Sequence, residues 1–357
     1  MRRNFDMKKY RNGILLTILL VLPCLLLAQD RTYPDLDEGV NPAPFQQVGQ
    51  SGWQFLKLPT HARYAAIGGV SSSLSHGDAA AALANPASVA DIEDINVSFS
   101  RMNWLVDTDY SSGSIVKNMG SIGYLGLNFV YVDYGSVQRT SVSNLVDENG
   151  DITGLSELVL EGLGTYESHD VAVGLTYART ITDRLQVGGN LRYVSETLDD
   201  ATTGNLSFDI GTVYYTGLKS LRIAMVGRNF GPDAEFVSFD QRVAVPATKV
   251  RMPMSFQLGA AFDILEGGDS SPYLWTVAAE LIHPNDGPEK FNVGTEYSLF
   301  NLLSLRGGYR FNYDEEDLTL GAGINVKTSS IGVGVNYAYI DFGRLSEVHM
   351  FSIDLKL

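Results

Sequence analysis

The sequence predicts an all-β protein: a transmembrane antiparallel outer-membrane β-barrel of about fourteen strands, with an N-terminal plug, or hatch, in its lumen. Three observations lead to this prediction. Apolar and polar residues alternate with a period of two through much of residues 94–357. The alternating segments are about 10–14 residues long, longer than most strands of soluble sheets. The segments that connect them are alternately long and short, like the loops and turns of an outer-membrane barrel.

The first 28 residues predict a secretory signal peptide. Basic residues precede an apolar run from Ile14 to Leu27, and Ala28-Gln29 is a suitable cleavage site. The run is short for a membrane-spanning helix, so we expect cleavage near Ala28 and localisation in the outer membrane. Lipid attachment at Cys24 is a less favoured alternative. After cleavage the chain would contain no cysteine, which excludes disulfides and thiol chemistry.

The composition restricts the class of partner. Charged residues make up 19% of the chain, and the formal net charge is −15. An acidic balance of this kind argues against a nucleic-acid partner. No other stretch is apolar enough for a membrane-spanning helix. A barrel with an apolar outer face would instead contact outer-membrane lipid.

Two segments precede the predicted strands. Residues 29–50 are polar and contain prolines, which is typical of a flexible N-terminus. Residues 51–93 are rich in glycine and alanine and fit neither a regular helix nor a strand. Because the strands after residue 93 form an even set without them, we expect residues 51–93 to form the plug; an ordinary N-terminal subdomain is the alternative. The candidate plug residues are Phe55, Leu56, Arg63, Gly68, Gly69, Asn85 and Pro86.

The predicted barrel occupies residues 94–357. Its expected strands are 94–104, 108–118, 121–133, 166–180, 184–197, 203–216, 219–230, 251–264, 272–283, 289–299, 302–312, 317–326, 329–340 and 346–356. With the N-terminus in the periplasm, the long connections 134–165 and 231–250 lie outside the cell, and the tight turns lie inside. Aromatic residues near strand ends predict interfacial girdles: Tyr131, Tyr134, Tyr214, Tyr215, Phe311 and Tyr313.

The polar faces of several strands carry charged residues that would point into the lumen. These residues are Arg192, Asp209, Glu280, Glu296, Arg306 and Arg310. Opposite charges on adjacent strands can pair across the ladder, so we expect them to hold the register and dock the plug. Substrate binding is the alternative role. Arg63 of the plug is expected to pair with Glu280 or Glu296.

The sequence contains no recognisable catalytic set. The histidines are scattered without metal-ligand spacing, and neither a nucleophile elbow nor a phosphate-binding loop is present. The acidic run 147–151 resembles a calcium loop, but Ile152 and Leu158 occupy positions that an EF-hand reserves for other residues. We therefore expect no catalytic, cofactor or metal site and no enzyme activity.

Several motifs together resemble a known family. They are Phe55-Leu56-Lys57-Leu58-Pro59, Ala62-Arg63, Gly68-Gly69, Asn85-Pro86-Ala87, His283-Pro284-Asn285-Asp286, Asn292-Val293-Gly294, Leu305-Arg306-Gly307-Gly308-Tyr309 and Asp341-Phe342-Gly343-Arg344-Leu345. In this order they resemble the PorV/PorQ family, FadL-like outer-membrane barrels of Bacteroidetes and related bacteria. The resemblance covers nearly the whole mature chain and implies a fourteen-strand barrel with an N-terminal hatch.

The resemblance also implies two competing functions. The first is a non-enzymatic role in type IX protein secretion, in which the barrel binds the translocon, attachment partners or the C-terminal signal domain of cargo. The alternative is a FadL-like channel for hydrophobic small molecules.

Each function requires its own site. Secretion would use an apolar part of the loop 134–165 to contact a partner, unless that part packs over the barrel mouth. Its candidate residues are Leu155, Leu158, Val159 and Leu160. A channel would need an apolar pocket between plug and wall. Its candidate residues are Trp53, Phe55, Leu56, Met102 and Trp104.

Overall fold

The computed structural model describes residues 51–74, 77–146, 152–159, 164–199, 201–235, 249–265, 272–328 and 331–357. The predicted signal peptide and the segment 29–50 lie outside these residues. Among the described residues, no helix combines the length and the hydropathy needed to cross a membrane.

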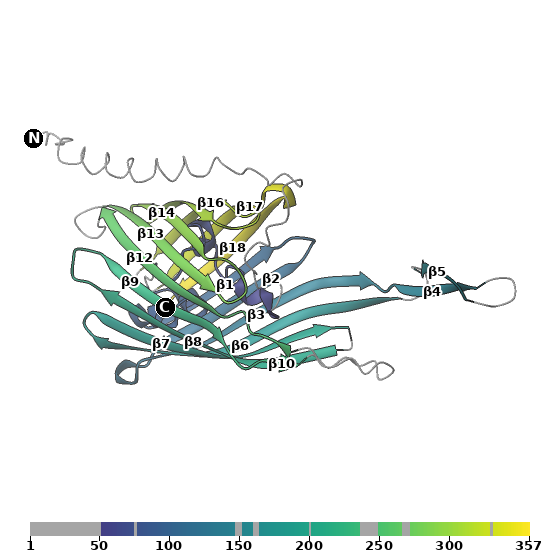
Figure 1. Cartoon of the computed structure of the whole chain (residues 1–357). Coiled ribbons are helices and arrows are strands. Elements are labelled where there is room, and N and C mark those ends of the chain that lie inside the picture. The colour runs from purple at the N-terminus through teal and green to yellow at the C-terminus, as the bar shows by residue number, and fades with distance from the viewer. Residues whose placement is uncertain are drawn as a thin grey trace, which may run out of the picture. The chain divides into compact units, whose positions relative to one another are not determined.

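Within the described residues, fourteen antiparallel strands form one closed barrel (Figure 1). The last strand pairs with the first, with Phe99 opposite Ile353, and this pairing closes the ring. The barrel strands are β1 (Ile95–Asn103), β2 (Asp109–Asn118), β3 (Tyr124–Gln138), β6 (Thr165–Thr182), β7 (Leu185–Leu198), β8 (Ala201–Tyr215), β9 (Arg222–Phe230), β12 (Ser255–Leu265), β13 (Tyr273–Pro284), β14 (Lys290–Leu299), β15 (Leu303–Phe311), β16 (Leu318–Lys327), β17 (Gly332–Asp341) and β18 (Glu347–Lys356). The predicted fold class is therefore confirmed, and each predicted strand coincides with one of these.

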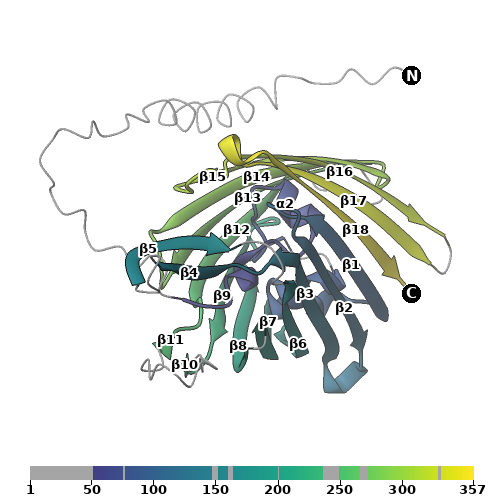
Figure 2. The same ribbon diagram turned by 90° about the vertical axis from the view of Figure 1, so that its right-hand side faces the viewer.

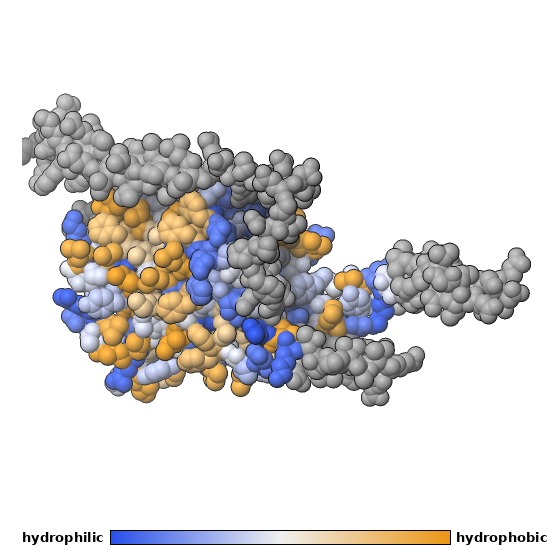
Figure 3. All heavy atoms as spheres, viewed as in Figure 1, coloured by the Kyte–Doolittle hydropathy of each residue, from blue (hydrophilic) through white to orange (hydrophobic). Residues whose placement is uncertain are grey.

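The alternation in the sequence separates the two faces of the wall. On β7, Asn190 and Arg192 are buried, whereas Leu191 and Tyr193 are 51% and 56% exposed. Figure 3 shows apolar residues spread over the outer wall on the side that faces the viewer. So much exposed apolar surface would be unfavourable in water but suits lipid. The chain is an outer-membrane barrel, as predicted.

The prediction of aromatic girdles is correct for only part of its residues. Tyr131 and Tyr214 point outward and are 40% and 45% exposed. Tyr134 and Tyr313 line an internal cavity, and Tyr215 donates a hydrogen bond inward to Asp91 (2.7 Å). Adjacent residues of a strand face opposite sides, so two neighbouring tyrosines cannot both belong to an outer girdle.

Two of the connections contain strands of their own. Between β3 and β6, β4 (Ser141–Val146) pairs with β5 (Ile152–Val159) in a separate two-stranded sheet. Between β9 and β12, β10 (Ala234–Glu235) pairs with β11 (Lys249–Val250). The sequence interpretation assigned no strands to the long connection 134–165, whose described residues include this hairpin. Of the predicted partner-contact residues, Leu155, Leu158 and Val159 lie on β5, and Leu160 lies outside the described residues.

Residues 51–74 and 77–92, here called the inner segment, run along the inside of the wall and contain several short helices. They are η1 (Gln54–Lys57), α2 (Ala62–Ala66), η2 (Ala79–Leu83) and η3 (Pro86–Asp91). Helix α2 packs on β16, β17 and β18, whereas η3 packs on β6, β7 and β8. These strands belong to different sides of the ring, so the inner segment crosses the lumen. Figure 2 shows these helices surrounded by barrel strands.

Short 3₁₀ helices complete the described structure. The turn from β2 to β3 contains η4 (Gly120–Ile122), and the turn from β17 to β18 contains η5 (Gly343–Leu345).

Candidate functional site

A cavity of about 430 Å³ lies between the inner segment and the wall. Its volume falls within the range of small-molecule sites in proteins. Aromatic side chains from both parts contribute to its lining: Phe55, Tyr64, Trp104, Tyr134 and Tyr313. Burial raises the pKa of Tyr313, which follows β15, to about 12, so its phenol is neutral at physiological pH.

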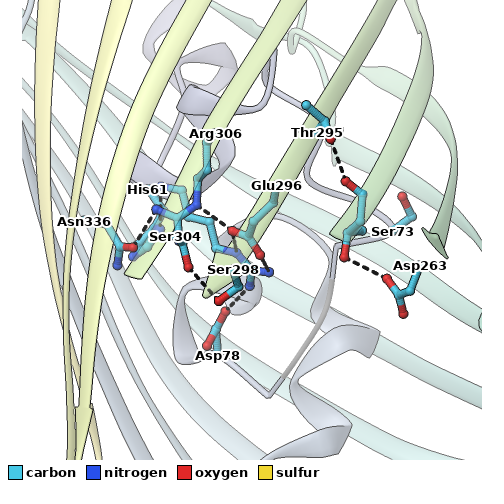
Figure 4. Close-up of polar contacts among 12 residues, drawn as sticks. His61, Ser73, Asp78, Asp263, Thr295, Glu296, Ser298, Ser304, Arg306 and Asn336 are labelled. Atoms are coloured by element: carbon cyan, nitrogen blue, oxygen red, sulfur yellow. Dashed lines mark hydrogen bonds and ion pairs between the residues drawn. The ribbon is translucent and has the colours of Figure 1, made fainter. Parts of the chain in front are cut away.

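Arg63 of α2 connects the inner segment to the wall. Its Nε donates to Glu296 Oε2 (2.9 Å) and its Nη2 donates to Glu296 Oε1 (2.7 Å). Its Nη1 donates to Asp78 Oδ2 (2.9 Å). Arg306, opposite Glu296 on the next strand, donates to the same carboxylate. Figure 4 shows Glu296, Arg306 and Asp78 gathered at this point. Two buried guanidinium groups therefore share one buried carboxylate.

The groups of the inner segment in this network are charged at neutral pH. Burial alone would lower the pKa of Arg63, but Glu296 and Asp78 outweigh burial and hold the pKa above its usual value. Burial alone would raise the pKa of Asp78, but Lys356 and Arg63 outweigh it and hold the pKa below its usual value. Lys356 Nζ lies 2.9 Å from Asp78 Oδ1, so the last strand also holds the inner segment.

Hydrogen bonds from the backbone of the inner segment reinforce these ion pairs. Ala62 N donates to Ser352 Oγ (2.8 Å), and Gly68 N donates to Thr319 Oγ1 (2.8 Å). His61 Nε2 lies 3.1 Å from Asp354 Oδ1. Buried backbone N–H groups need such partners.

The predicted Gly68-Gly69 pair adopts a conformation that favours glycine. The φ angles are 67° at Gly68 and 81° at Gly69. The wall approaches this turn closely at Gly294 and Gly308, which face each other on β14 and β15. A Cβ atom at Gly308 would lie 2.0 Å from Gly68 N. Glycines on both sides of the contact are therefore required.

Asn85 and Pro86 dock the other end of the inner segment. Asn85 caps η3, because its Oδ1 accepts from Ala87 N (3.1 Å) while its Nδ2 donates to Ser72 O (2.8 Å). Wall glycines make room for both residues: a Cβ at Gly211 would lie 2.0 Å from Asn85 Oδ1.

The expected apolar pocket is present only in part, because most of its predicted residues form a packed cluster. Trp53, Phe55, Leu56 and Met102 are buried in one hydrophobic core, and Trp104 packs against it. Only Phe55 and Trp104 of these also line the cavity. The other side chains fill the volume that was expected to be open.

The predicted lumen charges lie on the inner face of the wall. Four of them pair with one another, and the other two do not. Arg192 and Asp209 form a buried ion pair (2.6 Å), as do Arg306 and Glu296. Glu280 and Arg310 do not pair across the ladder, because Asn292 lies between them in the register.

The structure gives Glu280 and Arg310 separate partners. Glu280 Oε2 accepts from Ser72 N (2.8 Å), and Arg310 donates to Glu316 in the following loop. The sequence interpretation missed the roles of Asp78 and Lys356. Asp78 is the one acidic residue in the run Gly77–Leu83, and its isolation there was the available sign in the sequence that it has a partner.

Among the described residues, no group of three or more His, Cys, Asp or Glu side chains is arranged to hold a metal ion.

Comparisons with known proteins identify the type of barrel. No protein-family model matches the chain, and no curated protein matches it. Solved structures do match. The toluene transporter TbuX of Ralstonia pickettii has 14% identity and a TM-score of 0.52, covering 83% of this chain and 96% of its own. The chain and this toluene transporter share the fold of an outer-membrane barrel.

Two further structures match in the same way. The CymD monoaromatic hydrocarbon channel has 11% identity and a TM-score of 0.54, over 83% of this chain and 96% of its own. The toluene transporter TodX of Pseudomonas putida has 14% identity and a TM-score of 0.52, over 87% of this chain and 98% of its own. These similarities concern the fold. None of them bears on the PorV/PorQ assignment.

Proposed function

We propose that this FadL-like barrel is a channel that admits small hydrophobic molecules through the outer membrane. The observation that carries the proposal is the cavity of about 430 Å³ with aromatic lining between the inner segment and the wall. In this proposal the inner segment is a plug, and ligand passes when the plug shifts. Similarity in fold to hydrocarbon channels supports the proposal.

The network around Arg63 supports the role of the inner segment as a plug. The network joins the inner segment to the barrel wall through polar contacts. Such contacts can break and form again without unfolding the inner segment or the wall. The proposed channel performs no covalent chemistry, in keeping with the expectation that the protein is not an enzyme.

Uptake by intact cells tests the proposal. A host strain without its own hydrocarbon channels would express this protein, and entry of a radiolabelled alkylbenzene would be measured against an empty vector. We expect faster entry with the protein. Equal rates, with the barrel present in the outer membrane, would reject the proposal.

Type IX secretion is the second candidate function, together with membership of the PorV/PorQ family. The β4–β5 hairpin favours it, because these strands pair with each other and not with the barrel. Such a hairpin could contact a translocon or the signal domain of cargo. Deleting Ser141–Val159 should then reduce the release of cargo while leaving hydrocarbon entry unchanged. Normal release would reject this role.

A further inference from the structure

One side of the cavity carries buried polar side chains with unused hydrogen-bonding atoms. These residues are Arg228, Gln257, Glu280, Asn292 and Arg310, each at most 8% exposed. The atoms without a hydrogen-bond partner are Arg228 Nε, Gln257 Oε1, Glu280 Oε1, Asn292 Oδ1 and Arg310 Nε. Buried polar atoms normally have partners, so these five atoms are candidates for contact with a bound molecule.

The register of the sheet brings three of these residues together. Glu280 lies opposite Asn292, which lies opposite Arg310 on the next strand. Side chains opposite each other on one face of a sheet are close neighbours. The inner segment binds only one oxygen of Glu280, since Ser71 N and Ser72 N both donate to Oε2. The other oxygen, Oε1, is left unused.

Arg228 on β9 supplies positive charge to the cavity. It donates to Leu83 O (3.0 Å), and no carboxylate of the described residues lies within 4.0 Å of it. The cavity therefore presents a cation and a carboxylate that do not neutralise each other by direct contact.

The inventory of unused atoms matches one kind of polar group. Three of the atoms are acceptors, on Gln257, Glu280 and Asn292, and an ammonium group has three N–H donors. Two are guanidinium donors, on Arg228 and Arg310, and a carboxylate has two oxygens to accept from them. A bare hydrocarbon would leave all of these atoms without partners.

We propose that the cavity selects an aromatic zwitterion, a molecule with a ring at one end and both an ammonium and a carboxylate at the other. The ammonium binds Glu280 and its neighbouring acceptors, and the carboxylate binds Arg228 and Arg310. The ring packs among the aromatic side chains that line the rest of the cavity. This inference rests on the proposed channel function and specifies the polar end of its ligand.

A matched series of ligands tests the inference on the purified full-length protein in detergent. Isothermal titration would compare phenylalanine, 3-phenylpropionate, phenethylamine and propylbenzene, which share a ring and differ in their polar end. We expect phenylalanine to bind at least about tenfold more tightly than each of the other three, because each leaves buried groups unpaired. Equal or tighter binding of 3-phenylpropionate or propylbenzene would overturn the inference.

Two variants test which residue binds the ammonium of the ligand and which binds its carboxylate. Glu280→Gln should remove the preference for phenylalanine over 3-phenylpropionate, and Arg228→Met should remove the preference over phenethylamine. Lys117→Met, on an outward-facing position of β2, is the control and should change neither preference. Unchanged preferences in both cavity variants would overturn the assignment. If a variant does not assemble, the series on the unmodified protein still decides.

The series also separates this inference from the proposed channel function. Binding and cellular entry of propylbenzene without binding of phenylalanine would reject the zwitterion and keep the channel. Absence of binding and of entry for all four compounds would reject both.

Discussion

Arg63 of the inner segment and Glu296 of the wall are joined by two hydrogen bonds, of 2.9 and 2.7 Å. Both side chains are buried, at 9% and 4% exposure. A buried charge that loses its partner is strongly destabilising, so this pair makes the seated position of the inner segment specific.

Arg63→Ala should loosen the inner segment without stopping barrel assembly. The docking of the segment should weaken by about 3 kcal/mol, because Asp78 and Glu296 lose a buried partner. Hydrogen exchange of Ala62–Ala66 and limited proteolysis would measure the change, and heat-modifiable gel mobility would report barrel assembly.

Arg101→Ala provides the matched control. Arg101 pairs with Asp109 at 2.9 Å, but these side chains are 60% and 47% exposed. Its loss should cost less than about 1 kcal/mol. If the inner segment is as well protected from exchange in Arg63→Ala as in Arg101→Ala, the ion pair between Arg63 and Glu296 does not hold the segment in place.

The docking of the inner segment should depend on pH only in acid. The pKa of Asp78 is held below its usual value, so the charged form stabilises the docked state at any pH above the ordinary range near 4. This contribution is lost as the pH falls through the depressed pKa. Protease protection should therefore stay constant from pH 8 to about pH 5 and fall only well below pH 4. In Asp78→Asn this acid-dependent loss should be smaller. A midpoint between pH 6 and 7 would contradict this assignment.

Two adjacent glycines of β15 offer a further matched test. Gly308 faces the lumen, where a Cβ would lie 2.0 Å from Gly68 N. At Gly307, on the outer face, the nearest side-chain atom would be 3.6 Å away, on Leu320. Gly308→Ala should therefore displace the inner segment and increase its proteolysis, whereas Gly307→Ala should behave like the unmodified protein. Equal behaviour of the two variants would show that the segment does not pack at Gly308.

The sequence predicted the barrel because each strand shows the period-two alternation of apolar and polar residues within its own few residues. The face of each lumen charge followed from the same pattern, and the structure pairs Arg192 with Asp209 on adjacent strands. The sequence could not show whether Glu280 pairs directly with Arg310. That pairing depends on which residues lie opposite each other across three strands. That register places Asn292 between them.

The contacts of the inner segment were the least predictable part. Arg63 could be matched to a lumen acid, but Lys356 reaches Asp78 from the last strand, far away in the sequence. Pattern reasoning also treated Trp53, Leu56 and Met102 as pocket lining, although they fill a core. Whether apolar residues enclose a space or fill one depends on three-dimensional packing, which periodicity does not encode.

Blocking the cavity tests the central claim most directly. Ser71 lines the cavity and binds Glu280 through its backbone N–H, so Ser71→Trp fills the space and keeps that donor. Leu305→Trp, at a lipid-facing position that is 51% exposed, is the control. Entry of radiolabelled alkylbenzene into intact cells should fall to the empty-vector rate with Ser71→Trp and stay at the unmodified rate with Leu305→Trp. Undiminished entry with an assembled Ser71→Trp barrel would contradict passage through this cavity.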